Sequence, residues 1–222
     1  MKMDHQSFSR SAKVILSQYL NGDDYSINSL EEFLENVQSF DLASLLDDDD
    51  KKAFWINVYN GLTNYQIVKN QLKESVWEKE DFFRDELLKL GGFRFSLDAI
   101  EHGILRKNGP RKNGKPRQFS DGDLRLNLML ENMDFRVHFA LNCGSVSCPP
   151  IAFYSSDKID EQLGLAESSF SASEFIVDHV NKSIDCSAIF VWYRSDFGNH
   201  YLNDSVLSQY AVTERSYIWK IQ

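Results

Sequence analysis

The chain has 222 residues, of which 42% are hydrophobic and 13% aromatic, and its formal net charge at pH 7 is −9. This apolar content is enough to build a sizeable core, and it excludes a disordered chain. The acidic balance argues against general nucleic-acid binding, which requires a basic surface, so we expect no nucleic-acid partner.

The sequence carries no signal for a membrane. No stretch approaches the roughly 20 apolar residues that a membrane-spanning helix needs, and residues 1–6 lack the apolar core of a signal peptide. The 3 cysteines are too few, in a chain of this length, to form a disulfide framework. We therefore expect no membrane span and a cytoplasmic protein as the sequence stands, or an exported one if a leader has been trimmed.

The first half of the chain predicts helices. No proline, the strongest helix breaker, occurs before residue 110, and apolar residues recur there at helical spacing. The acidic run 47–50 is typical of a solvated helix start, because acids complement the helix dipole; a calcium site is the alternative, but the ligand spacing of an EF-hand is missing. The expected elements are helices over 12–20, 30–37, 42–46, 49–73 and 82–89, a strand over 93–95, and a helix over 97–106 capped by Ser96.

The second half begins with a loop over 107–117, rich in Gly, Pro, Asn and basic residues, and then mixes helices with strands. The expected elements are a helix over 121–131, a strand over 135–141, a helix over 157–170, a hairpin of 174–180 and 183–187, a strand or buried turn over 189–193, and a helix near 203–211. No repeat and no low-complexity linker occurs. We therefore expect one α+β domain, with a helix-rich N-terminal half packed on a small, mainly antiparallel sheet.

Two cysteines follow the expected strand 135–141 within a few residues. In a strand, Arg136 and His138 share one face, and Cys143 and Cys148 come next in the chain. Cys148 precedes a proline, which is favoured in the first turn of a helix, and a thiol at a helix N-terminus has a lowered pKa. His138 would then serve as the base of a Cys–His pair. The alternative is that both cysteines are small buried hydrophobes.

A second candidate pair lies on the expected helix over 97–106. Asp98 and His102 are one helical turn apart, so the carboxylate can orient and charge-stabilise the imidazole, and Glu101 supplies a second acid. The alternative is a local surface ion pair, which contributes little to stability. The spacing of the cysteines and histidines does not match the usual zinc patterns, and we expect neither a metal nor a cofactor.

Other polar and aromatic segments give further candidates. Asn57, Asn60 and Asn64 form a stripe on a segment that is apolar nearly all round, where buried amides either hold backbone or orient a catalytic side chain. A basic loop can receive an anionic substrate or acidic lipid headgroups, or be a mobile solvated loop; its members are Arg106, Lys107, Arg111, Lys112, Lys115 and Arg117. An aromatic series is expected in the core: Phe190, Trp192 and Tyr193, followed by Asp196 and Phe197.

Four blocks of the sequence occur in a set order: 53–60, then 97–106, then 136–143 with 147–149, then 189–193 with 196–197. In this order they resemble the domain of unknown function 547 family, over about residues 51–197. The resemblance implies a compact domain over 51–222 that follows an N-terminal helical extension over 1–50. It brings no established reaction; members occur in bacteria, and in plants joined to a coiled-coil region.

The resemblance also implies that the family's recurring polar positions matter, and it favours a thiol-dependent hydrolase or acyl transferase, broadly papain-like or transglutaminase-like, acting on a small molecule or a peptide. In this hypothesis the catalytic residues are Cys143, Cys148, His138, His102 and Glu101, and the substrate-binding residues are Arg136, Asn57 and Asn60. One cysteine is the nucleophile, one histidine the base, and an acid or amide (Glu101, Asp98 or Asn57) orients that base. Arg136 would hold an anionic group or stabilise developing negative charge.

Two other functions stay open. In the first, the same polar residues form a buried network that fixes the fold, and the protein is a non-enzymatic interaction module with a protein partner. In the second, Cys143 and Cys148 sense oxidants by forming a disulfide. A thiol sulfur and an imidazole nitrogen within hydrogen-bond reach at the base of a cleft would favour the enzyme, whereas two thiols sealed in apolar packing would favour the module.

Overall fold

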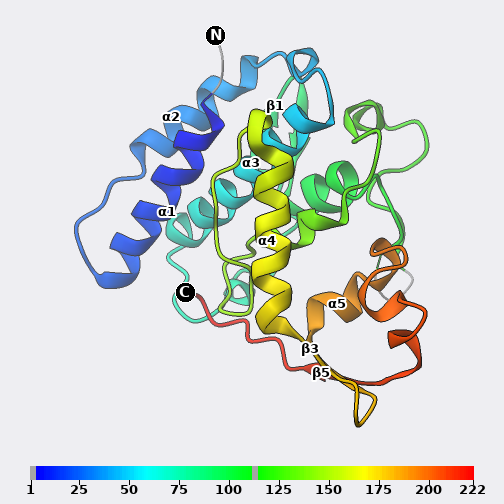
Figure 1. Cartoon of the computed structure of the whole chain (residues 1–222). Coiled ribbons are helices and arrows are strands. Elements are labelled where there is room, and N and C mark those ends of the chain that lie inside the picture. Colours follow the sequence, from blue (N-terminus) through cyan, green and yellow to red (C-terminus); the bar gives the residue numbers. More distant parts are fainter. Residues whose placement is uncertain (1–3, 112–114) are drawn as a thin grey trace.

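Helix α3 (Asp48–Lys69) lies at the centre of the structure, a computed structural model that describes residues 4–111 and 115–222 (Figure 1). Every residue of this helix from 52 to 68 is buried, as its apolar circumference predicts. Its first turn follows Asp47, whose carboxylate accepts hydrogen bonds from the backbone N–H groups of Asp49 and Asp50 at 3.0 and 2.9 Å. The acidic run is therefore a helix start, and the predicted long helix is confirmed.

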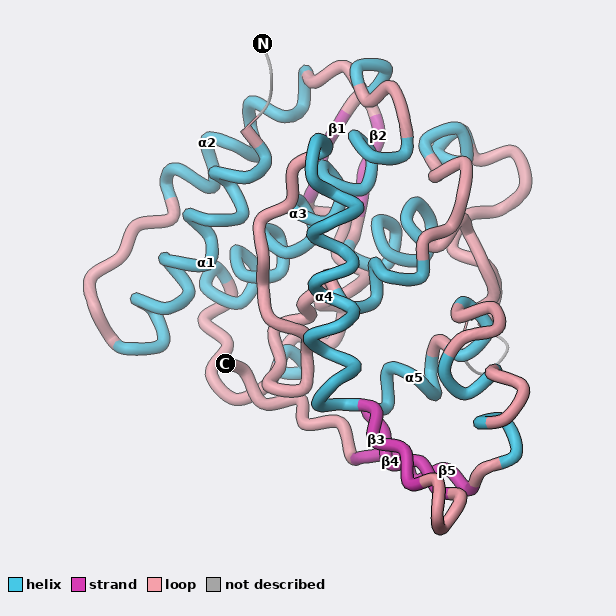
Figure 2. The backbone as a smooth tube through the Cα atoms, in the orientation of Figure 1, coloured by secondary structure: helices cyan, strands magenta, loops and turns pink. Residues whose placement is uncertain are grey.

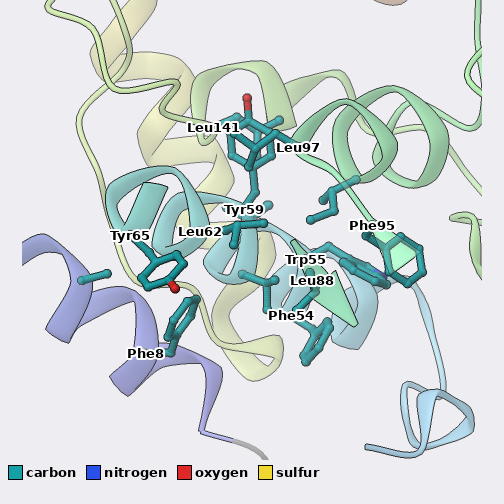
Figure 3. Close-up of a cluster of buried hydrophobic side chains, with 14 of the residues drawn as sticks. Phe8, Phe54, Trp55, Tyr59, Leu62, Tyr65, Leu88, Phe95, Leu97 and Leu141 are labelled. Atoms are coloured by element: carbon teal, nitrogen blue, oxygen red, sulfur yellow. The ribbon is translucent and has the colours of Figure 1, made fainter. Parts of the chain in front are cut away.

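Two N-terminal helices cover one side of α3. They are α1 (His5–Asn21) and α2 (Asn28–Asn36), and α1 packs closely against α3 (Figure 1). Gly61 in α3 permits this approach, because a Cβ atom at that position would overlap the ring of Phe8 in α1. The buried side chains around α3 form one hydrophobic cluster; Figure 3 shows part of it, including Trp55 of α3 and Phe95, whose ring centroids are 4.9 Å apart.

The strands form two small sheets (Figure 2). In the first, β1 (Leu88–Leu90) and β2 (Phe93–Phe95) are an antiparallel pair. In the second, β4 (Ser183–Ser187) pairs antiparallel with β3 (Phe175–Asp178) and parallel with β5 (Ala211–Arg215). Helix α4 (Ile159–Glu174) leads directly into β3, and the predicted hairpin of β3 and β4 is confirmed. The fold is α+β with a helix-rich N-terminal half, as the sequence predicts.

The segment predicted as a helix over 97–106 is mostly a π-helix, over Ala99–Leu105. The helical segment follows Ser96, which caps it as predicted: the hydroxyl of Ser96 accepts a hydrogen bond from the backbone N–H of Ala99 at 3.1 Å. Single π-helical turns are rare and occur frequently at functional sites. Here the π-helix carries Glu101 and His102, which both lie on the wall of one cavity.

Three predicted segments have a different secondary structure. Residues 135–141 alternate like a strand, but Phe135–Phe139 is a 3-10 helix, because the Asp134 carboxylate caps a helical turn by accepting a hydrogen bond from the N–H of Arg136. Residues 189–193 are not a strand but lie mostly in α5 (Ala188–Trp192), which the hydroxyl of Ser187 caps. Residues 82–89 are not a helix but a turn that leads into β1, and the two glycines at 91 and 92, both with positive φ, close the β1–β2 hairpin.

Two further predicted helices are shorter than expected. Of residues 121–131, Leu124–Leu128 forms a 3-10 helix. Near 203–211 a 3-10 helix ends at Asn203 and another spans Leu207–Gln209, before β5 begins. Neither Leu124–Leu128 nor Leu207–Gln209 has a fully buried side chain, and Leu126, Leu128 and Leu207 are only partly buried against the two clusters, so tertiary packing supports these turns less than it supports α3. In the described ranges, no helix has both the length and the apolarity that crossing a bilayer requires.

A second hydrophobic cluster contains Phe139, Phe170, Phe190 and Phe197 and lies next to the cluster around α3. The 3-10 helix Phe135–Phe139 joins the two, because its Val137 belongs to the cluster around α3 whereas its Phe139 belongs to the second cluster. His138, between these two residues, is buried at the junction. The fold therefore places His138, one of the predicted catalytic residues, between two apolar cores.

Candidate functional site

A cavity of about 160 Å³ lies where the two hydrophobic clusters meet, lined by Leu141 from the cluster around α3 and by Ile189 from the second cluster. The residues predicted to be catalytic all lie on its walls: Glu101, His102, His138, Cys143 and Cys148. The π-helix supplies the first two, the 3-10 helix supplies His138, and the following turn supplies the two thiols. Residues from separate parts of the chain therefore meet at one space.

The two thiols face each other across this turn. The sulfur atoms of Cys143 and Cys148 are 2.6 Å apart, and the Tyr217 hydroxyl lies 3.2 and 3.1 Å from them. The Ser145 hydroxyl is 3.3 Å from the Cys148 sulfur, which also accepts a hydrogen bond from the backbone N–H of Cys143 at 3.0 Å. Gly144, with φ of +86°, allows the tight turn that brings the two cysteines together.

These contacts separate the acidities of the two thiols. Burial alone would raise the pKa of Cys148, but hydrogen bonds from Cys143, Ser145 and Tyr217 outweigh it and lower this pKa to about 6. The hydrogen bond with Cys148 and burial raise the pKa of Cys143 well above its ordinary value. The pair therefore carries one negative charge at neutral pH, on Cys148. The predicted cause, a helix N-terminus at Cys148, is wrong, because no helix begins there and the donors are hydroxyl, thiol and backbone groups.

His138 is held by a buried carboxylate. Its Nε2 lies 2.9 Å from Oδ2 of Asp196, and its ring stacks on Tyr193 with centroids 4.0 Å apart. Arg106 donates to the same carboxylate from Nε at 2.5 Å and from Nη2 at 3.0 Å. Burial lowers the pKa of His138, so the imidazole is neutral at pH 7. Burial would raise the pKa of Asp196, but hydrogen bonds from His138 and Arg106 hold it well below its usual range.

Glu101 is bound by two tyrosine hydroxyls. Its Oε1 accepts a hydrogen bond from Tyr193 at 2.6 Å, and its Oε2 accepts one from Tyr59 at 3.1 Å. Burial would raise the pKa of Glu101, but the nearby His102 and the hydrogen bond from Tyr193 outweigh it and lower this pKa, so Glu101 is a carboxylate at neutral pH. His102 lies 3.6 Å from Glu101, and burial lowers the pKa of its imidazole.

The imidazoles and the thiols share the cavity but do not hydrogen-bond each other. Nε2 of His138 is bound to Asp196, and Nδ1 of His102 accepts from Arg106 at 3.0 Å. Among residues 4–111 and 115–222, no hydrogen bond joins an imidazole to a thiol. A base at His138 would therefore reach the thiols only through a substrate or a water molecule in the cavity, an arrangement that is common before substrate binds. The thiols are not sealed in apolar packing, since both line the cavity.

The family model described as "Protein of unknown function, DUF547" matches residues 43–170. The chain belongs to this family. The resemblance predicted from the sequence is thus confirmed, and the matched region contains the five predicted catalytic residues that line the cavity. Glucose starvation modulator protein 1 from Zygosaccharomyces rouxii is 26% identical over 121 residues, which are 53% of this chain and 22% of that protein. The chain corresponds to a minor part of that relative, and no solved structure matches it.

Three polar positions of the DUF547 resemblance lie away from the cavity walls. Arg136 forms a two-point ion pair with Asp134, both distances being 2.9 Å, and reaches Asp160 at 2.7 Å. Asn57 bonds the backbone of residue 154 through both its amide oxygen and its amide nitrogen. Asn60 likewise donates to the carbonyl of residue 140 at 3.0 Å and accepts from the N–H of residue 142 at 2.8 Å. Asn60 therefore fixes the backbone that leads into Cys143.

Several residues on or near the cavity walls were missed or misjudged in the sequence. Arg106, counted as part of the basic loop, is buried and paired with Asp196, and Arg111 of that loop binds Asp98 at 2.7 Å. Lys112 lies outside the described residues. The aromatic residues on the cavity walls include Tyr59, Trp192, Tyr193, Tyr217 and Trp219, of which Trp192 and Tyr193 were expected in the core. Each of these residues alone carries no local signal, because its partner lies on another segment.

Metal ligation has no support in the described part of the chain. Among residues 4–111 and 115–222, no group of three or more His, Cys, Asp or Glu side chains is arranged to hold a metal ion. The polar groups of the cavity instead satisfy one another through hydrogen bonds. The thiols, imidazoles and carboxylate on the cavity walls can support nucleophilic, acid–base and thiol–disulfide chemistry.

Proposed function

We propose that this protein is a thiol-dependent hydrolase or acyl transferase and that Cys148 is its nucleophile. One observation carries the proposal: a thiol with a lowered pKa and hydrogen-bonding contacts to three residues lines the same cavity as an imidazole that a buried carboxylate orients. A thiolate is the reactive form of cysteine, and orientation of a histidine by a carboxylate is the logic of catalytic triads. The substrate would be a small molecule or a peptide.

In the acylation step, the Cys148 thiolate attacks the carbonyl carbon of the substrate and forms a C–S bond. The C–N or C–O bond to the leaving group breaks, and the leaving group takes a proton from a water molecule, because burial raises the pKa of the Tyr217 hydroxyl and this hydroxyl keeps its proton. A water molecule, or the acceptor in a transferase, then attacks the thioester while neutral His138 takes its proton. The Cys148 thiolate leaves, and His138 releases its proton to the solvent, which replaces the proton that the leaving group took from water.

The test is to trap the acyl-enzyme. The full chain is incubated with p-nitrophenyl acetate at pH 7, and the acetylated peptide is located by mass spectrometry. We expect one acetyl group on Cys148, lost slowly by hydrolysis, and no acetylation of the Cys148→Ala variant at the cavity. Cys186→Ala is the matched control, because Cys186 is buried in the second cluster and does not line the cavity. Acetylation that persists unchanged in Cys148→Ala refutes the assignment.

The 2.6 Å distance between the sulfurs favours a second candidate function, thiol–disulfide exchange. The Cys148 thiolate would attack a disulfide substrate, Cys143 would resolve the mixed disulfide, and one substrate disulfide would be reduced to two thiols. Incubation with glutathione disulfide should then give a Cys143–Cys148 disulfide that dithiothreitol reverses. A protein that stays fully reduced in excess glutathione disulfide excludes this candidate.

Failure of both tests would leave the interaction module. In that case the cavity network serves the fold, and a protein partner binds elsewhere on the surface. The division into an extension over 1–50 and a domain over 51–222, the papain-like comparison and the cytoplasmic location remain predictions. The substrate-binding assignments of Arg136, Asn57 and Asn60 also remain predictions, and their contacts support a positioning role instead.

A further inference from the structure

The cavity has a continuous aromatic wall. Ring contacts link Phe83, Trp77, Trp219, Tyr217 and Trp192 in that order, with successive centroids 5.3, 4.9, 4.7 and 4.8 Å apart. All five residues line the cavity. Trp77 is 50% exposed, so the wall extends from the buried thiols to the solvent. Its members come from three parts of the chain: residues 77–83, helix α5, and the C-terminal segment with Tyr217 and Trp219, which contacts both of the others.

The polar floor of the same cavity carries excess negative charge. Glu101 is an ionised carboxylate, and within the described residues its one ion-pair partner is His102, whose lowered pKa keeps it neutral. The nearby guanidinium groups are already neutralised, Arg106 by Asp196 and Arg111 by Asp98. The tyrosine hydroxyls on Glu101 stabilise its charge but do not cancel it. Among residues 4–111 and 115–222, no Lys or Arg forms an ion pair with Glu101, so a cation entering the cavity would meet its negative charge.

We infer that this cavity binds a cationic ammonium group of the substrate, an inference that rests on the proposed function because it names the substrate class of the same site. Aromatic faces, tryptophan above all, attract cations, and recognition of ammonium groups by aromatic cages is their best-known use. The volume of about 160 Å³ is small for a whole ligand and fits one group of a larger molecule. The anionic substrate that the basic loop suggested finds no free guanidinium here.

The experiment measures binding of choline to the full-length protein by isothermal titration calorimetry. The matched control ligand is 3,3-dimethylbutan-1-ol, which has the shape of choline but no charge. We expect choline to bind at least about tenfold more tightly than the alcohol, because a desolvated cation–π contact accounts for a difference of that size. A second arm compares the peptide acetyl-Gly-Lys-Gly-amide with its norleucine analogue. Tighter binding of the peptide than of choline assigns the ammonium to a peptide, and the reverse assigns it to a small molecule.

Two variants locate the site. Glu101→Gln and Trp219→Leu should each weaken choline binding at least severalfold, whereas Tyr25→Leu, which removes a partly exposed ring outside the cavity, should not. Equal affinity for choline and the alcohol, or no binding of choline and of the lysine peptide to the wild-type protein, overturns the inference without any variant. Because binding is read by heat and acylation by mass, either proposal can fail while the other stands.

Discussion

Replacing Asp196 by Asn is expected to destabilise the protein strongly. The carboxylate accepts four hydrogen bonds: two from Arg106 at 2.5 and 3.0 Å, one from His138 at 2.9 Å, and one from the hydroxyl of Ser195 at 3.1 Å. The side chains of Arg106 and Asp196 are 2% and 8% exposed, so the substitution leaves a buried guanidinium without its counter-charge. Breaking a buried ion pair in this way costs about 3–5 kcal/mol. For a chain of this size, that cost lowers Tm by roughly 6–20 °C.

The assay is urea unfolding at pH 7, monitored by circular dichroism. The free energies of unfolding of the wild-type protein and Asp196→Asn are compared with the same dependence on urea concentration for both. Glu31→Gln is the control, because it removes the exposed partner of Lys69, and its midpoint should stay close to that of the wild type. A loss below about 1 kcal/mol in Asp196→Asn would place this pair among the weak surface pairs. The reasoning from burial would then be wrong.

The same substitution predicts a pH dependence. The pKa of Asp196 is depressed in the folded state, so the folded protein holds this proton less tightly than the unfolded chain, where the value is about 3.9. The contribution of the charge to stability is therefore complete above that value and is lost as the pH falls toward the folded-state pKa. The stability difference between wild type and Asp196→Asn should be fully present at pH 7, where His138 is neutral in both proteins, and shrink below about pH 4. A difference that does not change on acidification contradicts the assignment of the depressed pKa.

Three further predictions concern the thiols, one glycine and one helix cap. Alkylation of Cys148 by iodoacetamide should reach half its maximal rate near pH 6, not near the ordinary value of about 8.5, and Tyr217→Phe should move this midpoint upward because it removes a donor; a wild-type midpoint above 8 contradicts it. Gly103→Ala should cost about 1–3 kcal/mol in thermal unfolding, because the added Cβ overlaps the ring of Phe119, and an unchanged Tm would refute that overlap. Asp47→Ala should lower the free energy of unfolding in urea by about 1 kcal/mol, whereas Asp47→Ser should keep the wild-type value, because both Asp and Ser cap a helix. An equal loss of stability in both variants would argue against capping.

The elements that the sequence predicts well are those whose signals are local. The long central helix follows its capping acid Asp47, and the hairpin of β3 and β4 follows its alternation and its short turn. Residues 135–141 fail because their period of two is compatible with a strand, while the Asp134 side chain, just outside the pattern, caps a helical turn. The periodicity of a segment shows neither that a neighbouring side chain caps a helical turn nor that a strand would lack a partner in the fold.

The candidate site is predictable only in part for a related reason. The four blocks of the resemblance contain all five residues that were expected to be catalytic, and these do line one cavity. The groups that set their chemistry are farther away in the chain: Asp196 lies 90 residues from Arg106, and Tyr217 lies 69 residues from Cys148. Pairings at such separations depend on the tertiary fold, which no spacing rule describes.

The error at residues 135–141 has a consequence for the site itself. In a strand, Val137 and Phe139 would share one face, with His138 on the opposite face. In the 3-10 helix they enter different hydrophobic clusters, and His138 emerges at the junction of these clusters, where Asp196 and the cavity lie. Places where local sequence preference yields to the fold are expected to be functional or strained. The disagreement between pattern and structure at His138 is therefore an independent reason to direct the first experiments at this cavity.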